Sequence, residues 1–189
     1  MINIAIFASG TGSNALKIIE HFAGHHTIRV ALVVSNKPTA KVLAMAESHN
    51  IPTMRLKKAF FYESEEILNI FNRYSINFIA LAGFLLLIPP YLIHAYQNHI
   101  LNIHPSLLPK YGGKGMYGNK VHQAVKEAGE RESGMTIHFV NEHYDEGNII
   151  FQAKCAIEED DTAESIAAKV LKLEHANYPR VIEEVVGSG

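Results

Sequence analysis

Short, nearly continuous runs of apolar residues recur along the first hundred positions, and longer stretches with apolar residues at helical spacing separate them. Runs without polar alternation are typical of strands that are covered on both faces of a parallel sheet. Strands are therefore predicted at Ile2 to Ala8, Ile28 to Val34, Thr53 to Leu56, Phe78 to Ala82 and Ile100 to Ile103. Helices are predicted between them, at Asn14 to Phe22, Ala40 to His49, Glu63 to Tyr74 and Pro90 to Tyr96. This alternation indicates an open α/β sheet with right-handed crossovers.

The pattern changes beyond this region. A loop from Pro105 to Gly118 precedes a predicted helix at Lys120 to Ala128, and the strands Met135 to Val140 and Asn148 to Ile157 then flank a turn. Two strands joined in this way predict an antiparallel addition at one edge of the sheet. The last helix is predicted to begin at Thr162, with Asp161 or Thr162 as its cap. Its core-facing residues are predicted to be Ile166, Val170, Leu173 and Ala176.

Composition narrows the function classes. The 189 residues suit one domain, and 17 Lys plus Arg against 19 Asp plus Glu provide no broad basic surface for nucleic acid. The single cysteine, Cys155, lies in an apolar run, so neither a disulfide nor a cysteine metal site is expected, and the side chain is predicted to be buried. The N-terminus lacks a signal-peptide pattern and no apolar run reaches membrane-spanning length, so a cytoplasmic protein is expected.

The loop between the first strand and the first helix, Ser9-Gly10-Thr11-Gly12-Ser13-Asn14, is a candidate anion site. Backbone N–H groups and the helix dipole favour a phosphate at such a turn. The loop has neither the Walker A lysine nor the third glycine of a dinucleotide fingerprint. A glycine-rich turn without any ligand is the alternative.

Asn102 and His104 stand two residues apart at a predicted strand end, so their side chains share one face. The amide could hydrogen-bond a developing oxyanion while the imidazole moves a proton. Asp145, in the turn between the last two strands, could lie beside the imidazole and raise its pKa. The alternatives are a turn-forming Asn102, a satisfied His104 and an ordinary turn aspartate. Ser106 lacks a nucleophile-elbow motif and is expected to hold its loop.

The chain has eleven histidines, but none has the H-E-x-x-H spacing of a zinc site, and a metal-free protein is expected. Thr136 and His138 share a strand face that could line a cleft or meet solvent, and the sequence favours neither. Glu174 and His175 come late in the final helix, where a solvated charged face is expected.

Six motifs together resemble the phosphoribosylglycinamide formyltransferases, folate-dependent enzymes of purine synthesis. The motifs are Ser9 to Asn14, Leu81 to Phe84, Leu101 to Lys110, Ser133 to Val140, Asp145 to Gly147 and Leu173 to His175. The resemblance implies an open, mostly parallel, Rossmann-like sheet with helices on both faces and an antiparallel edge, the formyltransferase fold. It also implies one domain over 1–189, with a phosphate-binding half (1–100) and a catalytic, folate-binding half (101–189).

The resemblance further implies the roles of individual residues. Asn102 and His104 would be catalytic, with Asp145 orienting and charging the histidine, and Glu174 would contact the ribonucleotide. The substrate phosphate would be held by Gly12, Ser13 and Asn14. The folate would be held by Leu85, Leu86, Leu87, Ile88, Asn102, Asn141 and Tyr144. The substrates implied are 10-formyltetrahydrofolate and 5-phosphoribosylglycinamide, with direct attack and no covalent intermediate.

Some segments depart from the family pattern. Residues 85–88 carry no arginine, and the shortened region 57–66 lacks the family's folate-binding arginine, for which Lys57 or Lys58 could substitute. The glycine-rich loop Tyr111 to Gly118 could act as a lid, with Lys114 approaching the phosphate. Rival functions are formyl transfer to an amino sugar or methionyl-tRNA, hydrolysis of 10-formyltetrahydrofolate, and non-catalytic nucleotide binding. A monomer and a homodimer both remain open.

Overall fold

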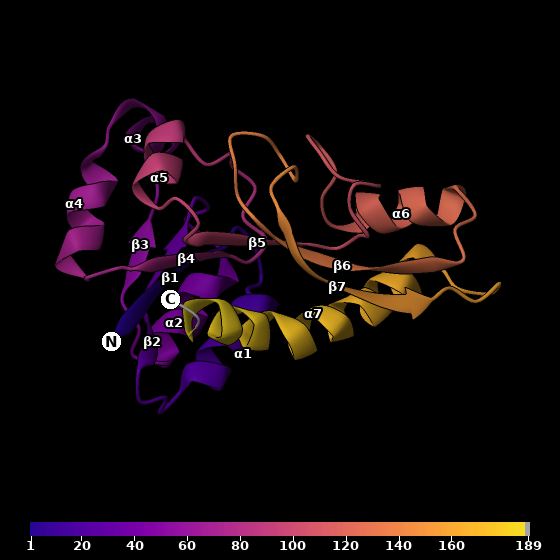
Figure 1. Ribbon diagram of the computed structural model, residues 1–189, viewed down its shortest axis with the longest axis horizontal. Helices are drawn as coiled ribbons and strands as arrows, with labels where there is room; N and C mark the ends of the chain where they lie inside the picture. Colours follow the sequence, from indigo (N-terminus) through magenta and orange to yellow (C-terminus); the bar gives the residue numbers. More distant parts are fainter. Residues whose placement is uncertain (188–189) are drawn as a thin grey trace.

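A seven-stranded sheet organises the computed structural model, which describes residues 1–187 (Figure 1). The strand order is β3-β2-β1-β4-β5-β6-β7. Strands β1 to β5 pair in parallel, whereas β6 and β7 are antiparallel. The strands are β1 (Ile2–Phe7), β2 (Ile28–Ser35), β3 (Thr53–Arg55), β4 (Phe78–Leu81), β5 (Ile100–His104), β6 (Glu132–Phe139) and β7 (Ile149–Ala156). The predicted mostly parallel sheet with an antiparallel edge is confirmed.

Seven helices surround the sheet within the described residues. They are α1 (Ser13–Phe22), α2 (Lys41–Ser48), α3 (Lys58–Glu63), α4 (Glu66–Arg73), α5 (Pro90–Ala95), α6 (Asn119–Glu127) and α7 (Ala163–Gly187). The single helix predicted from Glu63 to Tyr74 is wrong at its start. The backbone is extended at Ser64, which ends the short α3, and α4 then begins at Glu66, whose N–H donates to Ser64 Oγ at 3.0 Å.

The sheet separates two hydrophobic cores, because alternate residues of its central strands point to opposite faces. On β1, Ile4 and Ile6 pack with α1, α2 and α7, whereas Ala5 and Phe7 pack with α3, α4 and α5. All four of these side chains are fully buried. Burial on both faces explains why the strand reads as a continuous apolar run.

The long helix α7 starts as predicted, but the residues on its buried face differ from the predicted ones. Thr162 Oγ1 accepts the Ser165 N–H at 3.2 Å, and Ser165 Oγ accepts the Thr162 N–H at 2.9 Å, which gives a reciprocal cap. The buried stripe includes Ile166, Val170, Glu174, Tyr178 and Ile182. Ala176 is exposed, so its predicted core position is wrong, because it lies half a turn from that stripe.

The crevice for a ligand follows from the strand order. From β1 the chain builds β2 and β3 on one side, and β4 and β5 are added on the other, so the loops after β1 and β4 diverge. The two loops remain linked, because the Ser9 N–H donates to the Gly83 carbonyl at 3.0 Å. Ser9 Oγ also accepts the Leu85 N–H at 3.0 Å.

Two smaller findings bear on the composition. Across residues 1–187, the structure contains no helix that is both long and apolar enough to cross a membrane. Cys155 is half-buried rather than buried, because it lies on β7, the edge strand of the sheet. Residues 188–189 of the predicted second half lie outside the described part of the chain.

Candidate active site

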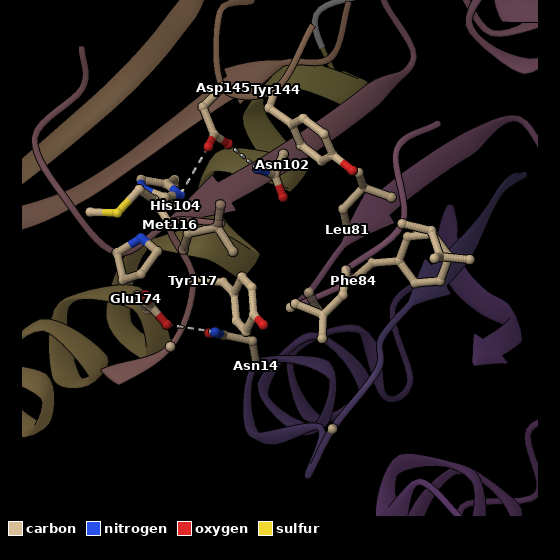
Figure 2. Close-up of a pocket in the computed structure, with 18 of the residues that line it drawn as sticks. Asn14, Leu81, Phe84, Asn102, His104, Met116, Tyr117, Tyr144, Asp145 and Glu174 are labelled. Carbon is tan, nitrogen blue, oxygen red and sulfur yellow. Dashed lines mark hydrogen bonds and ion pairs between the residues drawn. The ribbon is translucent and has the colours of Figure 1, made fainter. Parts of the chain in front are cut away.

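A cleft of about 690 Å³ opens at the carboxyl ends of β1, β4 and β5 (Figure 2). Its position is the one at which open α/β sheets bind ligands. Helix α7 contributes Ala167, Leu171 and Glu174 to its wall. The loops that line it are residues 10–14, 81–88, 102–105, 113–119 and 143–145.

The loop at residues 9–14 is shaped by close packing. Gly12 adopts a φ of 82°, and a Cβ at this position would lie 2.5 Å from Val42 Cγ2. Only glycine satisfies both constraints without strain. Gly12 is also the N-cap residue of α1, and no side chain caps this helix. The first backbone N–H groups of α1 are therefore available to an anion in the cleft.

Asn14 and Glu174 join α1 to α7 at this end of the cleft. Asn14 Nδ2 donates to Glu174 Oε2 at 2.6 Å (Figure 2). Glu174 is only 7% exposed, so the expected solvated face is wrong at this residue. Burial raises the pKa of the Glu174 carboxyl, and the Asn14 hydrogen bond opposes part of that rise.

At the other end, the structure brings together Asn102, His104 and Asp145, which come from β5 and from the loop after β6 (Figure 2). His104 Nδ1 lies 3.5 Å from Asp145 Oδ2, and Asn102 Nδ2 lies 3.3 Å from Asp145 Oδ1. The Gly113 N–H donates to Asp145 Oδ2 at 2.9 Å. Asp145 has a φ of 57°, an uncommon left-handed conformation that aims its carboxylate at the histidine.

Both nitrogens of His104 face acceptors. Nε2 donates to the Tyr111 carbonyl at 2.8 Å, and Nδ1 faces the Asp145 carboxylate. Burial lowers the pKa of His104, while Asp145 and the Tyr111 carbonyl offset part of that fall. Asp145 does push the pKa upward as expected, but the cost of burying the imidazolium is larger.

The pKa of Asp145 is lowered, because the groups around its carboxylate outweigh the effect of burial. Burial alone would raise its pKa, but the neighbouring His138 and His104 rings and the Gly113 N–H together hold that pKa below its usual value. The anion is therefore stabilised from three sides, and it faces His104 as a charge.

His138 is the member of this cluster to which the sequence assigned no catalytic role. It is 2% exposed and lines the cleft, so of the two open alternatives for its strand face the solvent-facing one is wrong. Its Nδ1 donates to the Phe139 carbonyl at 2.8 Å, so Nε2 accepts from Asn102 Nδ2 at 3.1 Å. Asn102 and His138 are cross-strand partners. This contact turns the Asn102 amide nitrogen toward Asp145 and its oxygen away from that carboxylate (Figure 2).

The predicted folate residues divide into two groups. Residues 85–88 and Tyr144 line the cleft. Asn141 is not among the lining residues, because its Oδ1 accepts the His143 N–H at 3.0 Å within the turn. Lys57 and Lys58, at the start of α3, do not line the cleft either, whereas Lys114 does.

The glycine-rich loop is anchored firmly at its first residues. Lys110 Nζ and the Tyr111 hydroxyl donate to Glu130 Oε1 at 2.8 Å and 2.9 Å. Ser106 Oγ donates to the Lys110 carbonyl at 2.7 Å, so Ser106 does hold its loop. Over the described residues 1–187, no group of three or more His, Cys, Asp and Glu side chains could hold a metal ion.

The structure thus combines a cleft at the switch point of a mostly parallel sheet with a polar Asn-His-Asp cluster at one end of that cleft. The chain belongs to the formyl transferase family, whose model matches residues 2–182.

Individual relatives narrow the comparison. The chain is 44% identical over 185 residues to the chloroplastic phosphoribosylglycinamide formyltransferase of Arabidopsis thaliana, covering 95% of this chain and 63% of the relative. It is 39% identical to the phosphoribosylglycinamide formyltransferase of Bacillus subtilis, covering 99% of this chain and 96% of that one. It therefore spans about three fifths of the plant relatives, 63% and 59%, and nearly all of the Bacillus subtilis protein.

The fold agrees with solved structures. The phosphoribosylglycinamide formyltransferase of Bacillus halodurans superposes with a TM-score of 0.86 at 37% identity, covering 97% of this chain and 95% of that one. A glycinamide ribonucleotide transformylase of Geobacillus kaustophilus gives a TM-score of 0.87 at 35% identity, covering 98% of each chain.

Proposed function

We propose that the protein transfers the formyl group of 10-formyltetrahydrofolate to the amine of 5-phosphoribosylglycinamide, a step of de novo purine biosynthesis. The observation that carries the proposal is that one cleft contains both the uncapped N-terminus of α1 and the Asn102, His104 and Asp145 cluster. The first suits the phosphate, and the second suits acyl transfer. The names of the relatives support the same reaction.

In this proposal the two substrates meet between the two ends of the cleft. Gly12, Ser13 and Asn14 hold the phosphate, and Glu174 contacts the ribonucleotide. The folate lies along residues 85–88, Asn102 and Tyr144, and Asn141 shapes the turn that precedes Tyr144. The lining of this region is largely apolar, as a flat heterocycle requires.

The reaction begins when the substrate amine attacks the formyl carbon. Asn102 was expected to donate its amide N–H to the oxyanion, but Asp145 and His138 hold that nitrogen, so Asn102 presents its oxygen to an N–H of the amine and His104 takes the oxyanion role. Protonated His104 keeps Nδ1–H on Asp145, and the formyl oxygen takes over Nε2–H from the Tyr111 carbonyl. The developing oxyanion favours the imidazolium, which offsets the effect of burial. The attacking nitrogen then loses a proton, and His104 assists the transfer of a proton to the folate nitrogen as the bond between that nitrogen and the formyl carbon breaks, with no covalent enzyme intermediate.

The test follows formyl transfer spectroscopically with 5-phosphoribosylglycinamide, with water alone, and with an amino sugar or methionyl-tRNA. We expect rapid turnover only with 5-phosphoribosylglycinamide. Equal turnover with water alone would indicate a hydrolase, and preference for another amine would indicate a different transferase. Binding of both ligands without turnover would indicate a nucleotide-binding protein. We place the reaction in the cytoplasm, although the plant relatives are named as chloroplastic.

A further inference from the structure

His122 is a buried histidine of the cleft that the mechanism above does not use. It lies on the first turns of α6, is 5% exposed and lines the cleft. Its Nδ1 is shut off from solvent and has no hydrogen-bond partner among residues 1–187. Its Nε2 has no hydrogen-bond partner among residues 1–187 either. Unlike Nδ1, however, Nε2 retains some solvent exposure, so it belongs to the small exposed part of the ring.

These two environments decide which nitrogen carries the proton. A proton on Nδ1 would leave a buried N–H without an acceptor, which costs about 1–3 kcal/mol. A lone pair at Nδ1 and a proton on Nε2 avoid most of that cost. Burial lowers the pKa of His122, and the neighbouring His104 lowers it further, so the ring is held neutral. His122 therefore presents one neutral N–H donor to the cleft.

A purely structural role does not account for this donor. His138, which is also buried, has partners for both of its nitrogens, as a structural histidine should. The core contacts of α6 are already made by Val121 and Val125. An unpartnered donor on a cleft wall is instead the state of a group that meets its acceptor on a ligand.

The location indicates which ligand supplies the acceptor. Helix α6 packs against α7, which carries Glu174, and His104 is close enough to His122 to lower the pKa of His122. An amine substrate whose phosphate lies on residues 12–14 and whose nitrogen lies near His104 has to pass this wall. Between its phosphate and its nucleophilic nitrogen, 5-phosphoribosylglycinamide has an amide carbonyl oxygen and ribose oxygens, which are all acceptors.

We propose that His122 Nε2–H donates a hydrogen bond to an acceptor oxygen of the amine substrate and so positions its nitrogen for attack. This inference rests on the proposed function. In this inference, the side of the cleft formed by α6 recognises the uncharged part of the substrate. That part lies between the phosphate, bound at residues 12–14, and the amine, which lies near His104.

Three substitutions test it. His122→Gln can place an amide N–H near the position of Nε2, whereas the shorter His122→Asn reaches only the position of Nδ1, and His122→Phe has no donor. In the Asn and Phe variants we expect the KM for 5-phosphoribosylglycinamide to rise about tenfold, with the KM for 10-formyltetrahydrofolate unchanged. The Gln variant should stay within about threefold of wild type.

Several results would overturn the inference. These are wild-type kinetics in His122→Phe, activity retained by Asn but lost by Gln, or a rise confined to the folate KM. If the Phe variant fails to fold, as its thermal unfolding would reveal, the comparison of Gln with Asn still decides. A wild-type protein that transfers no formyl group refutes the proposed function, and calorimetric binding of 5-phosphoribosylglycinamide to the same variants then tests His122 alone.

Discussion

The two ends of the cleft are built in different ways. The phosphate end comes from one continuous loop, residues 9–14, whose shape depends on glycine and on packing against α2. The catalytic end is assembled from β5, β6, the turn at Asp145 and the loop at Tyr111 through side-chain hydrogen bonds. Changes at the first end should therefore affect binding and stability, and changes at the second should affect turnover.

The largest effect is expected at the catalytic end. His104→Ala removes the group that stabilises the oxyanion and moves the proton, so kcat should fall by about 10²-fold or more. Steady-state kinetics at saturating concentrations of both substrates measures it. His26→Ala, at an exposed histidine, is the matched control and should leave kcat unchanged. Unchanged turnover in His104→Ala would remove this residue from the mechanism.

The next effect distinguishes two glycines of one loop. Gly12→Ala forces a Cβ to within 2.5 Å of Val42 Cγ2 at a φ of 82°, and should lower the free energy of unfolding by about 2 kcal/mol. Gly10→Ala is the control, because a Cβ there meets nothing within 4 Å. Chemical denaturation of both variants measures the difference. Equal stability would mean that packing does not determine the shape of this loop.

A smaller effect separates binding from chemistry. Asn14→Asp puts a carboxylate opposite Glu174 Oε2 and next to the phosphate, so the dissociation constant for 5-phosphoribosylglycinamide should rise at least about tenfold. Folate affinity should change little. Calorimetric titration with each substrate measures both constants, and similar losses for the two would contradict the division of the cleft.

The smallest effect concerns acid stability. Asp145 has a folded-state pKa below its usual value of 3.8, so its contribution to stability is present above that value and is lost as the pH falls through the folded-state pKa. The stability difference between wild type and Asp145→Asn should therefore be constant near neutral pH and shrink below pH 3.8. Thermal unfolding across this range checks it, and a difference independent of pH would show that the native pKa is not depressed.

The same contrast explains what the sequence could predict. The strands of the parallel half follow from continuous apolar runs, and the glycine loop follows from local chemistry, so both are visible in a linear reading. The contact between Asn102 and His138 depends on the register of β5 against β6, which no local pattern encodes.

Local sequence patterns also do not reveal which polar side chains are buried. The sequence predicts a solvated helix face at Glu174, but this residue lies on the buried face of α7. The break before Glu66 could have been recognised from Ser64, whose hydroxyl readily accepts a backbone N–H two residues further on. The role of His122 could not have been recognised in this way, because the lack of a partner for its Nδ1 among residues 1–187 is a property of the packed cleft.

The most direct test of the account is the kinetics of Asp145→Ala, because the central claim is that this carboxylate acts through His104. We predict that kcat falls by about 10²-fold or more, while the dissociation constants for both substrates stay within about threefold of wild type. Glu146→Ala, at the exposed neighbouring acid, should behave as wild type. Wild-type turnover in Asp145→Ala would contradict the account.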